Sequence, residues 1–189
     1  MNYLGHLYFS NNNPELMVAN LYGDYVKGSK LDRFSVLVQR GIRLHRAIDN
    51  FIDTHPDVLA LKRNLYEELP KVSGIAVDLF FDHLLARNWS IYHDMPYIQF
   101  LERFYAHQII SQVEYTEDFL KFIEAMRTHD WLSHYPSSYG LLKSCQGVSR
   151  KLSFPNLLDT GADVFKKNED EITQCFKKYM HDARFYFKI

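Results

Sequence analysis

Apolar residues recur along most of this chain at the three- and four-residue spacing of amphipathic α-helices. No segment shows the sustained alternation of apolar and polar residues that a half-buried β-strand requires, and no Gly/Ser-rich linker divides the chain. The pattern predicts an all-α fold, a single-domain helical bundle over residues 1–189. Residues 96–189 are expected to form a helical tail that completes the core.

Prolines and glycines set the expected helix boundaries, since proline favours a helix start and glycine a helix end. The first helix is expected to begin at Pro14 and to end before Gly28. A second, over residues 34–53, should end near His55, which precedes a proline and therefore disfavours helical backbone. The other expected helices cover residues 57–69, 72–93, 96–110, 116–130 and 159–187, with two short helices around Gly140 and Gly147.

The stretch Ile75–Tyr92 is the most informative segment. As a helix it would be apolar on almost every side and therefore buried, yet it contains Asp78, Asp82 and His83. A buried carboxylate without a partner is very costly, and buried charges are normally paired or bound to a metal. Two acids and an imidazole in an apolar helix therefore predict a bound cation.

Further polar residues stand in apolar surroundings near the start of the chain. His6 lies within LGHLYF and Asp24 lies between two tyrosines. His45, Asp49 and Asp53 follow at four-residue steps, which places them on one side of a single helix. Nitrogen and oxygen ligands without thiolate suit Mn, Mg, Fe or Zn and are typical of sites that activate water. We expect such a metal site mostly within residues 1–95.

Each of these residues also has a structural interpretation. A backbone carbonyl would satisfy His6 inside a core, and Asp53 is placed to cap a helix. Asp49 is placed to pair with a neighbouring arginine or to hold a ligating histidine from behind. For Asp82 and His83 the functional interpretation is favoured, because packing alone hardly satisfies two adjacent ionisable groups in an apolar helix.

Composition narrows the functional class. The formal net charge of −1 gives no overall basic field for nucleic acid, and no apolar run reaches the roughly 18 residues of a membrane span. The N-terminal segment lacks the basic residues of a signal peptide, the first being Lys27. Cys145 and Cys175 form no CxxC motif and fit a reducing compartment. We expect a cytoplasmic protein without a nucleic-acid or membrane partner.

Positive charge is nevertheless concentrated in one stretch, between Val26 and Ala47, where Asp32 is the only acid. Such a surface favours an anionic partner or a phosphate-bearing substrate, although scattered solubility charges explain any single residue equally well. Arg46, beside His45, is the best candidate for a phosphate clamp. The remaining basic residues of the stretch are Lys27, Lys30, Arg33, Arg40 and Arg43.

Four motifs together resemble the acyl-carrier-protein phosphodiesterase family, which looks like a rearranged relative of the HD-type metal phosphohydrolases. They are MNYLGHLYFS, NLYGDYVKG, GIRLHRAIDNFIDTHP and DLFFDHLLARNW, in that order within the first half of the chain. The resemblance implies an HD-phosphohydrolase-like helical fold. It also implies a hydrolase that removes 4′-phosphopantetheine from holo-acyl carrier protein.

The resemblance further implies a divalent metal, manganese first, with Mg²⁺ or Fe²⁺ as alternatives. The implied metal ligands are Asp24, His45, Asp82 and His83. The implied catalytic residues are Asp49, Asp78, Arg46 and His6, of which His6, Asp49 and Asp78 would be nearby supports or further ligands. Acyl carrier proteins are acidic, so the partner would dock on the basic surface of Lys27, Lys30, Arg33, Arg40 and Arg43.

Two alternatives remain open from the sequence. A metal site reports the reaction class better than the substrate, so another metal phosphohydrolase of the HD type, acting on a nucleotide or a small phosphodiester, fits the same residues. A non-enzymatic helical interaction protein would instead pair its buried polar groups with one another and would bind no metal.

Overall fold

The computed structural model describes residues 1–109 and 114–189, and all regular structure within them is helical, which confirms the all-α prediction. The elements in chain order are α1 (Tyr3–Tyr8), α2 (Pro14–Leu21), η1 (Tyr22–Tyr25), α3 (Val36–Thr54), α4 (Pro56–Asn64), α5 (Ser73–Arg87), α6 (Trp89–Tyr92), α7 (Tyr97–Ala106), α8 (Glu117–Thr128), η3 (Trp131–His134), α9 (Ser138–Ser149), η4 (Leu158–Thr160), α10 (Gly161–Lys167) and α11 (Glu169–Phe187).

Two of the expected helix starts have polar caps. The Asn13 side-chain oxygen accepts a hydrogen bond from the Leu16 backbone N–H at 3.1 Å, so α2 begins at Pro14 as predicted. The Ser35 hydroxyl accepts from the Val38 N–H at 3.4 Å and begins α3. Each cap satisfies an N–H that the first helical turn leaves without an intrahelical partner.

Two long helices, expected over residues 72–93 and 159–187, are each divided by an asparagine. Asn88 separates α5 from α6, and Asn168 separates α10 from α11. Both side-chain amides donate to the carbonyl oxygen four residues earlier, at 2.8 Å and 2.9 Å respectively. Asparagine competes in this way with the backbone ladder, and hydrophobic periodicity alone does not reveal such a break.

The two short helices expected around Gly140 and Gly147 are instead one helix, α9. Gly140 does not end a helix but lets α9 lie close to the backbone of His134. A Cβ at this position would lie 1.9 Å from the His134 carbonyl oxygen. Glycine here allows α9 to pack directly against the backbone of η3.

Several expected helices are shorter than their patterns suggest. The first continues beyond Leu21 as the 3₁₀ turn η1, and α4 ends at Asn64, where the following turn directs Leu65 and Leu69 into the core. The helix expected over residues 96–110 ends at Ala106, and Ile110 lies outside the described residues.

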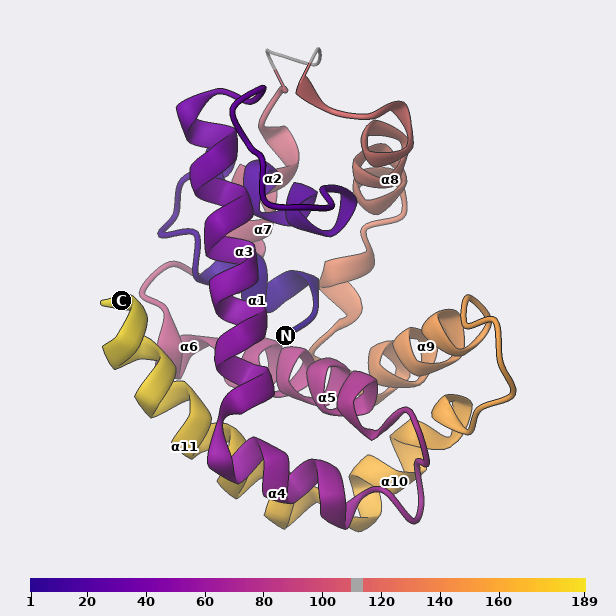
Figure 1. Cartoon of the computed structure of the whole chain (residues 1–189). Helices are drawn as coiled ribbons and strands as arrows, with labels where there is room; N and C mark the ends of the chain where they lie inside the picture. Colours follow the sequence, from indigo (N-terminus) through magenta and orange to yellow (C-terminus); the bar gives the residue numbers. More distant parts are fainter. Residues whose placement is uncertain (110–113) are drawn as a thin grey trace.

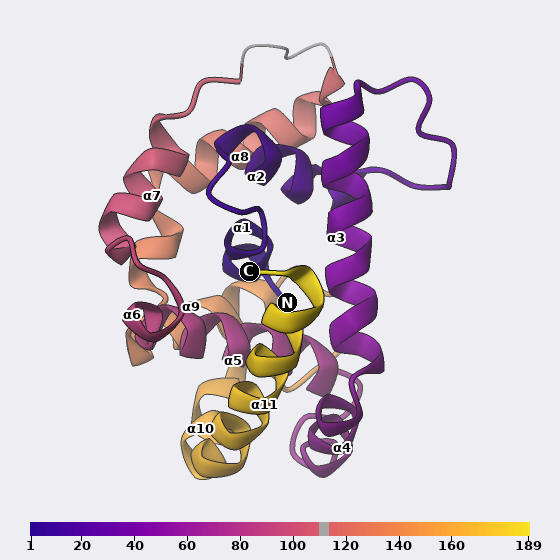
Figure 2. The same cartoon turned by 90° about the vertical axis from the view of Figure 1, so that its left-hand side faces the viewer.

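The long helix α3 runs along one side of the molecule, and α2 packs closely against it (Figure 1). Gly41 of α3 allows this approach, because a Cβ there would lie 2.4 Å from the Cβ of Ala19. α11 packs against both α4 and α5, so the C-terminal half closes over the N-terminal half. α1 lies centrally, with α3 on one side and α7 on the other (Figure 2).

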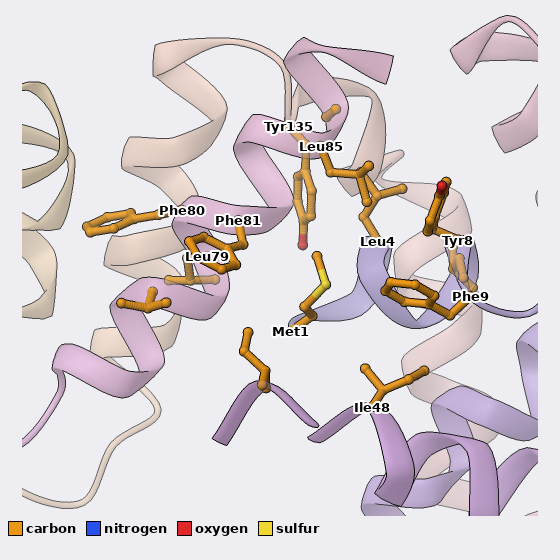
Figure 3. Close-up of a cluster of buried hydrophobic side chains, with 14 of the residues drawn as sticks. Met1, Leu4, Tyr8, Phe9, Ile48, Leu79, Phe80, Phe81, Leu85 and Tyr135 are labelled. Atoms are coloured by element: carbon orange, nitrogen blue, oxygen red, sulfur yellow. The ribbon is translucent and has the colours of Figure 1, made fainter. Parts of the chain in front are cut away.

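One buried hydrophobic cluster extends from Met1 to Ala183 and joins both halves of the chain. Figure 3 shows part of it, where Met1 and Leu4 from the N-terminal segment lie among side chains of α5 that include Phe81 and Leu85. Most of the first residues of the chain are therefore core residues, and α1 packs against α2 and α5. Within the described residues, no helix is both long enough and apolar enough to cross a membrane.

Candidate metal centre

Three residues from two helices form the strongest candidate site. His45 and Asp49 are one turn apart on α3, and His6 comes from the last turn of α1. The two oxygens of Asp49 lie 3.3 Å from His6 Nε2 and 3.1 Å from His45 Nε2. One potential ligand atom from each residue lies within 4.8 Å of the other two. The Asp49 carboxylate thus contacts both imidazole rings.

The two histidines are buried, whereas the carboxylates reach solvent. The side chains of His6 and His45 are each 4% exposed, compared with 42% for Asp49 and 61% for Asp24. The imidazole rings of the site are therefore shielded from solvent, whereas its carboxylates are accessible to solvent.

A glycine makes room for His45. A Cβ on Gly23 would lie 2.3 Å from Cγ of the His45 ring, so η1 passes directly over the imidazole. The same 3₁₀ turn carries Asp24, whose Oδ1 lies 3.2 Å from His45 Nε2. The sequence YGDY therefore combines the space for the ring with the carboxylate that faces it.

Asn20 fixes the tautomer of His6. Its Nδ2 group donates to the His6 carbonyl oxygen at 2.9 Å and to the Ser10 hydroxyl oxygen at 3.0 Å, so its Oδ1 must be the atom that faces His6 Nδ1 at 3.0 Å. Nδ1 therefore carries the hydrogen, and neutral His6 presents a free lone pair on Nε2 toward Asp49. Second partners of this kind commonly orient metal-ligating histidines.

The charges of the cluster depend on one another. Although burial alone would raise the pKa of Asp49, the His45 and His6 side chains beside its two oxygens lower it well below its usual range. Burial lowers the pKa of His6, against the influence of Asp49. Burial also opposes the protonation of His45, but Asp24 and Asp49 outweigh it and raise its pKa to about 9. The structure thus favours a protonated, positively charged His45 and a neutral His6 beside these carboxylates.

His45 also has a buried atom without a partner. Its Nδ1 makes no hydrogen bond within the part of the chain that the structure describes, while Nε2 faces two carboxylates. A buried nitrogen of this kind is costly unless a ligand or water satisfies it.

The donor set of the three-residue group is compatible with a divalent cation, because it consists of imidazole nitrogens and carboxylate oxygens.

Asp82 and Asp78 have different partners. Asp82 is buried, and its two oxygens accept from the backbone N–H groups of Leu4 at 2.7 Å and Gly5 at 3.1 Å, at the start of α1. Burial raises the pKa of Asp82 to about 7. Asp78 Oδ1 lies 3.3 Å from the Met1 amino group. Both acids of α5 therefore hold the segment that carries His6.

His83 makes contacts on another side of α5. Its Nδ1 donates to the Tyr135 carbonyl oxygen at 2.7 Å, and its ring stands at 90° to that of Phe165. Burial lowers its pKa, which favours the neutral ring. Of the four implied metal ligands, the structure thus brings Asp24 and His45 together, and it does not bring Asp82 or His83 into the three-residue group.

Arg46 lies beside the site but is engaged in holding a loop. Its guanidinium donates to the carbonyl oxygens of Val26 at 2.9 Å and Gly28 at 2.7 Å. The loop that follows η1 is thereby tied to α3, one residue beyond His45. Asp53, the second acid of the α3 series, pairs with Lys62 at 2.7 Å and also lies outside the three-residue group.

The predicted basic surface is divided. Arg43 precedes His45 by two residues, so its side chain projects about 200° around the helix from that of His45. Arg40 and Arg43 accordingly line a separate pocket with Tyr186 and other residues of the C-terminal end. Lys27 and Lys30 lie instead in the exposed loop after η1.

Sequence reasoning had named every residue of the three-residue group but had missed Asn20. An asparagine within the apolar helix ELMVANL was the signal that could have revealed it, since a buried amide needs partners. The significance of His6 as a direct member of the group also became clear only from the fold, because α1 is too short to show a helical period.

Comparison with known proteins agrees with these motifs. The family model described as acyl carrier protein phosphodiesterase matches residues 1–183. A relative of that name from Enterobacter sp. (strain 638) is 27% identical over 191 residues, covering 97% of this chain and 98% of the relative. Another, from Escherichia coli O6:H1, is 29% identical over 190 residues, with 97% of both chains covered. A third, from Serratia proteamaculans, is 36% identical over 90 residues, 48% of this chain and 47% of the relative. No solved structure matches the chain.

Proposed function

Since the chain belongs to the acyl carrier protein phosphodiesterase family, whose members are named as hydrolases of phosphodiester bonds, we propose that it converts holo-acyl carrier protein to apo-acyl carrier protein and 4′-phosphopantetheine. The structural observation that carries this proposal is the group of His6, His45 and Asp49, in which the carboxylate of Asp49 is partly exposed to solvent. In the reaction, a water oxygen bonds to phosphorus, the bond from phosphorus to the serine oxygen of the carrier protein breaks, and that oxygen takes a proton.

We assign His6, His45 and Asp49 as the residues that hold a divalent ion, manganese first. Two ligand atoms each about 2.1 Å from one ion, at an angle of roughly 90–110°, lie about 3.0–3.4 Å apart. The separations of 3.1 Å and 3.3 Å between the Asp49 oxygens and the two Nε2 atoms fit this spacing. When bound, such an ion would polarise a phosphoryl oxygen and would lower the pKa of a coordinated water from about 15.7 towards 7.

Asp24 has the position of a catalytic or additional ligating carboxylate. Its side chain is more exposed than that of Asp49 and contacts His45, yet it lies outside the three-residue group. We assign it the task of orienting the attacking water, for which hydrogen-bond reach and an ionised carboxylate are the requirements. This assignment replaces a simple ligand role for Asp24, as the resemblance alone had implied.

For the acidic partner we propose a docking surface on the loop after η1. Lys27 and Lys30 are exposed there, three and six residues beyond Asp24, and Arg46 fixes the loop against α3. Positive charge on this loop would therefore steer an anionic protein to the solvent-exposed side of the metal centre. Arg40 and Arg43 project away from His45, so their reversal to glutamate should reduce turnover less than reversal of Lys27 and Lys30.

The deciding experiment uses the purified protein, holo-acyl carrier protein and Mn²⁺, with the carrier protein followed by intact-mass spectrometry. Loss of the phosphopantetheine mass that stops on chelation, and that an Asp49→Asn variant does not produce, supports both reaction and site. An unchanged mass, with metal bound and a generic phosphodiester hydrolysed, would favour another substrate. Neither metal nor hydrolysis would favour the interaction-protein alternative.

A further inference from the structure

An aromatic pocket of about 390 Å³ lies between the start of α1, η3 and α9. Its walls include Tyr3, Trp131, Tyr135 and Tyr139. This volume falls in the range of roughly 300–1,000 Å³ that is usual for small-molecule sites. Figure 1 shows the elements that frame it, with the N-terminus close to the ribbon that leads into α9.

Two ammonium groups stand at the aromatic walls. Lys143 Nζ lies 5.3 Å from the centroid of the Tyr139 ring, and Lys151 Nζ lies 5.8 Å from that of Trp131. Within the described ranges 1–109 and 114–189, neither has a carboxylate at ion-pair distance. Apolar walls with a few donors suit a ligand that combines an apolar body with carbonyl or anionic oxygens.

Tyr3 connects the pocket with the helix that carries His6. Tyr3 lines the pocket, and His6 follows Tyr3 by three residues on α1, so the two side chains lie on the same face of that helix. The Tyr3 ring packs 5.1 Å from Phe122, which in turn lies 6.0 Å from Tyr25, the residue after Asp24. Burial and the nearby Asp24 carboxylate raise the pKa of Tyr3 to about 12.

We propose that this pocket binds the pantetheine arm of the substrate, so that the phosphodiester at its end lies against His6, His45 and Asp49. The proposal rests on the function proposed above and adds a substrate subsite to it. The arm offers methyl groups for the aromatic walls and amide carbonyls for the lysines. Because it is flexible, holding it in one place converts binding energy into orientation of the reacting bond.

Gly147 provides a direct test. It lines the pocket within α9, and a Cβ at this position would meet nothing within 4 Å. Gly147→Phe should therefore fill the pocket without straining the fold, and the metal centre has no contact with it. Gly147→Ala is the matched control, since it changes the same helical position but adds little volume.

The measurement compares two inhibitors of the hydrolysis of bis(p-nitrophenyl) phosphate by the Mn²⁺-loaded protein. Inorganic phosphate can compete only at the metal centre, whereas 4′-phosphopantetheine adds the arm. In the wild type and in Gly147→Ala, we expect 4′-phosphopantetheine to inhibit at least about tenfold more strongly than phosphate, equivalent to about 1.4 kcal/mol. In Gly147→Phe the two inhibition constants should become nearly equal.

Equal inhibition constants in the wild type, or a preference for 4′-phosphopantetheine that survives in Gly147→Phe with an unchanged melting temperature, would overturn the proposal. Failure of the proposed function is recognised separately. It would show as holo-acyl carrier protein left intact by a wild type that nevertheless hydrolyses the small diester, whatever the ratio of inhibition constants.

Discussion

The imidazole rings of His6 and His45 stack with their centroids 4.1 Å apart and their planes 14° from parallel. Two imidazolium cations at this distance would repel each other, so the arrangement favours at least one neutral ring. Asn20 holds His6 in the tautomer that has a free Nε2, and Asp49 faces both rings. The stacked pair therefore presents two nitrogen donors in a preformed arrangement that a cation can occupy.

Replacement of Asp49 should separate the metal centre from the residues that merely hold α1. Asp49→Asn removes the carboxylate that faces both imidazoles, and we expect metal affinity to fall by more than about 100-fold, beyond the loss usual for an outer partner. Asp82→Asn should retain metal affinity within about tenfold. Isothermal titration of the metal-free proteins with Mn²⁺ measures both.

The Asp82 variant is also the control for this comparison. Its neutral amide would direct an N–H group at the backbone N–H of Leu4 or Gly5, so the free energy of unfolding should fall by about 1–3 kcal/mol. If Asp82→Asn or His83→Gln abolishes Mn²⁺ binding while the helix signal persists, the ligand set implied by the family resemblance is the correct one.

Gly23→Ala should displace the His45 ring. The added Cβ would lie 2.3 Å from Cγ of the imidazole, and such overpacking typically costs about 1–3 kcal/mol. We expect lower thermal stability together with weaker metal binding, measured by calorimetry on the same samples. Gly147→Ala, at a position with open space, should show neither effect. Wild-type metal affinity in Gly23→Ala would mean that His45 is not a ligand.

Loss of the Asn20 amide should weaken metal binding without removing a ligand. Asn20→Ala frees His6 Nδ1, so the ring is no longer held in one tautomer, and metal affinity should fall by about 10–100-fold. Ser10→Ala removes a contact of the Asn20 amide group and a hydrogen bond to the His6 carbonyl oxygen, but no partner of His6 Nδ1, and is expected to have a smaller effect. Histidine nitrogen NMR shifts would report the tautomer directly, and an unchanged Nδ1–H signal in Asn20→Ala would contradict this account.

Asp82 should make the protein less stable as pH rises from about 4 to about 7. Its pKa is raised to about 7 in the folded state by burial, against about 3.9 in the unfolded chain. Between these values the folded state retains a proton that the unfolded state has lost, so the free energy of unfolding falls with increasing pH. Above about 7 both states are ionised, and this contribution no longer changes.

Denaturant unfolding of the wild type and Asp82→Asn at pH 5 and pH 8 isolates this effect, since other titrating groups are common to both proteins. We expect the stability difference between wild type and variant to shift in favour of the variant at pH 8. A difference that is independent of pH would show that Asp82 has an ordinary pKa in the folded protein.

Local sequence signals predicted much of the fold. Pro14 identified the start of α2, and the spacing of His45 and Asp49 correctly placed both side chains on one face of α3. The breaks at Asn88 and Asn168 were missed, because each depends on a side-chain amide competing with the backbone ladder.

The amino-acid sequence by itself determined the helical class, the motifs of the family and the chemical types at the site. Only the tertiary structure decided which polar residues meet. Asp82 is predicted to be a metal ligand because a buried carboxylate needs a partner, and in the structure its two oxygens accept hydrogen bonds from two backbone N–H groups of α1. His6 joins His45 because α1 is buried beside α3, a long-range contact that no local pattern encodes.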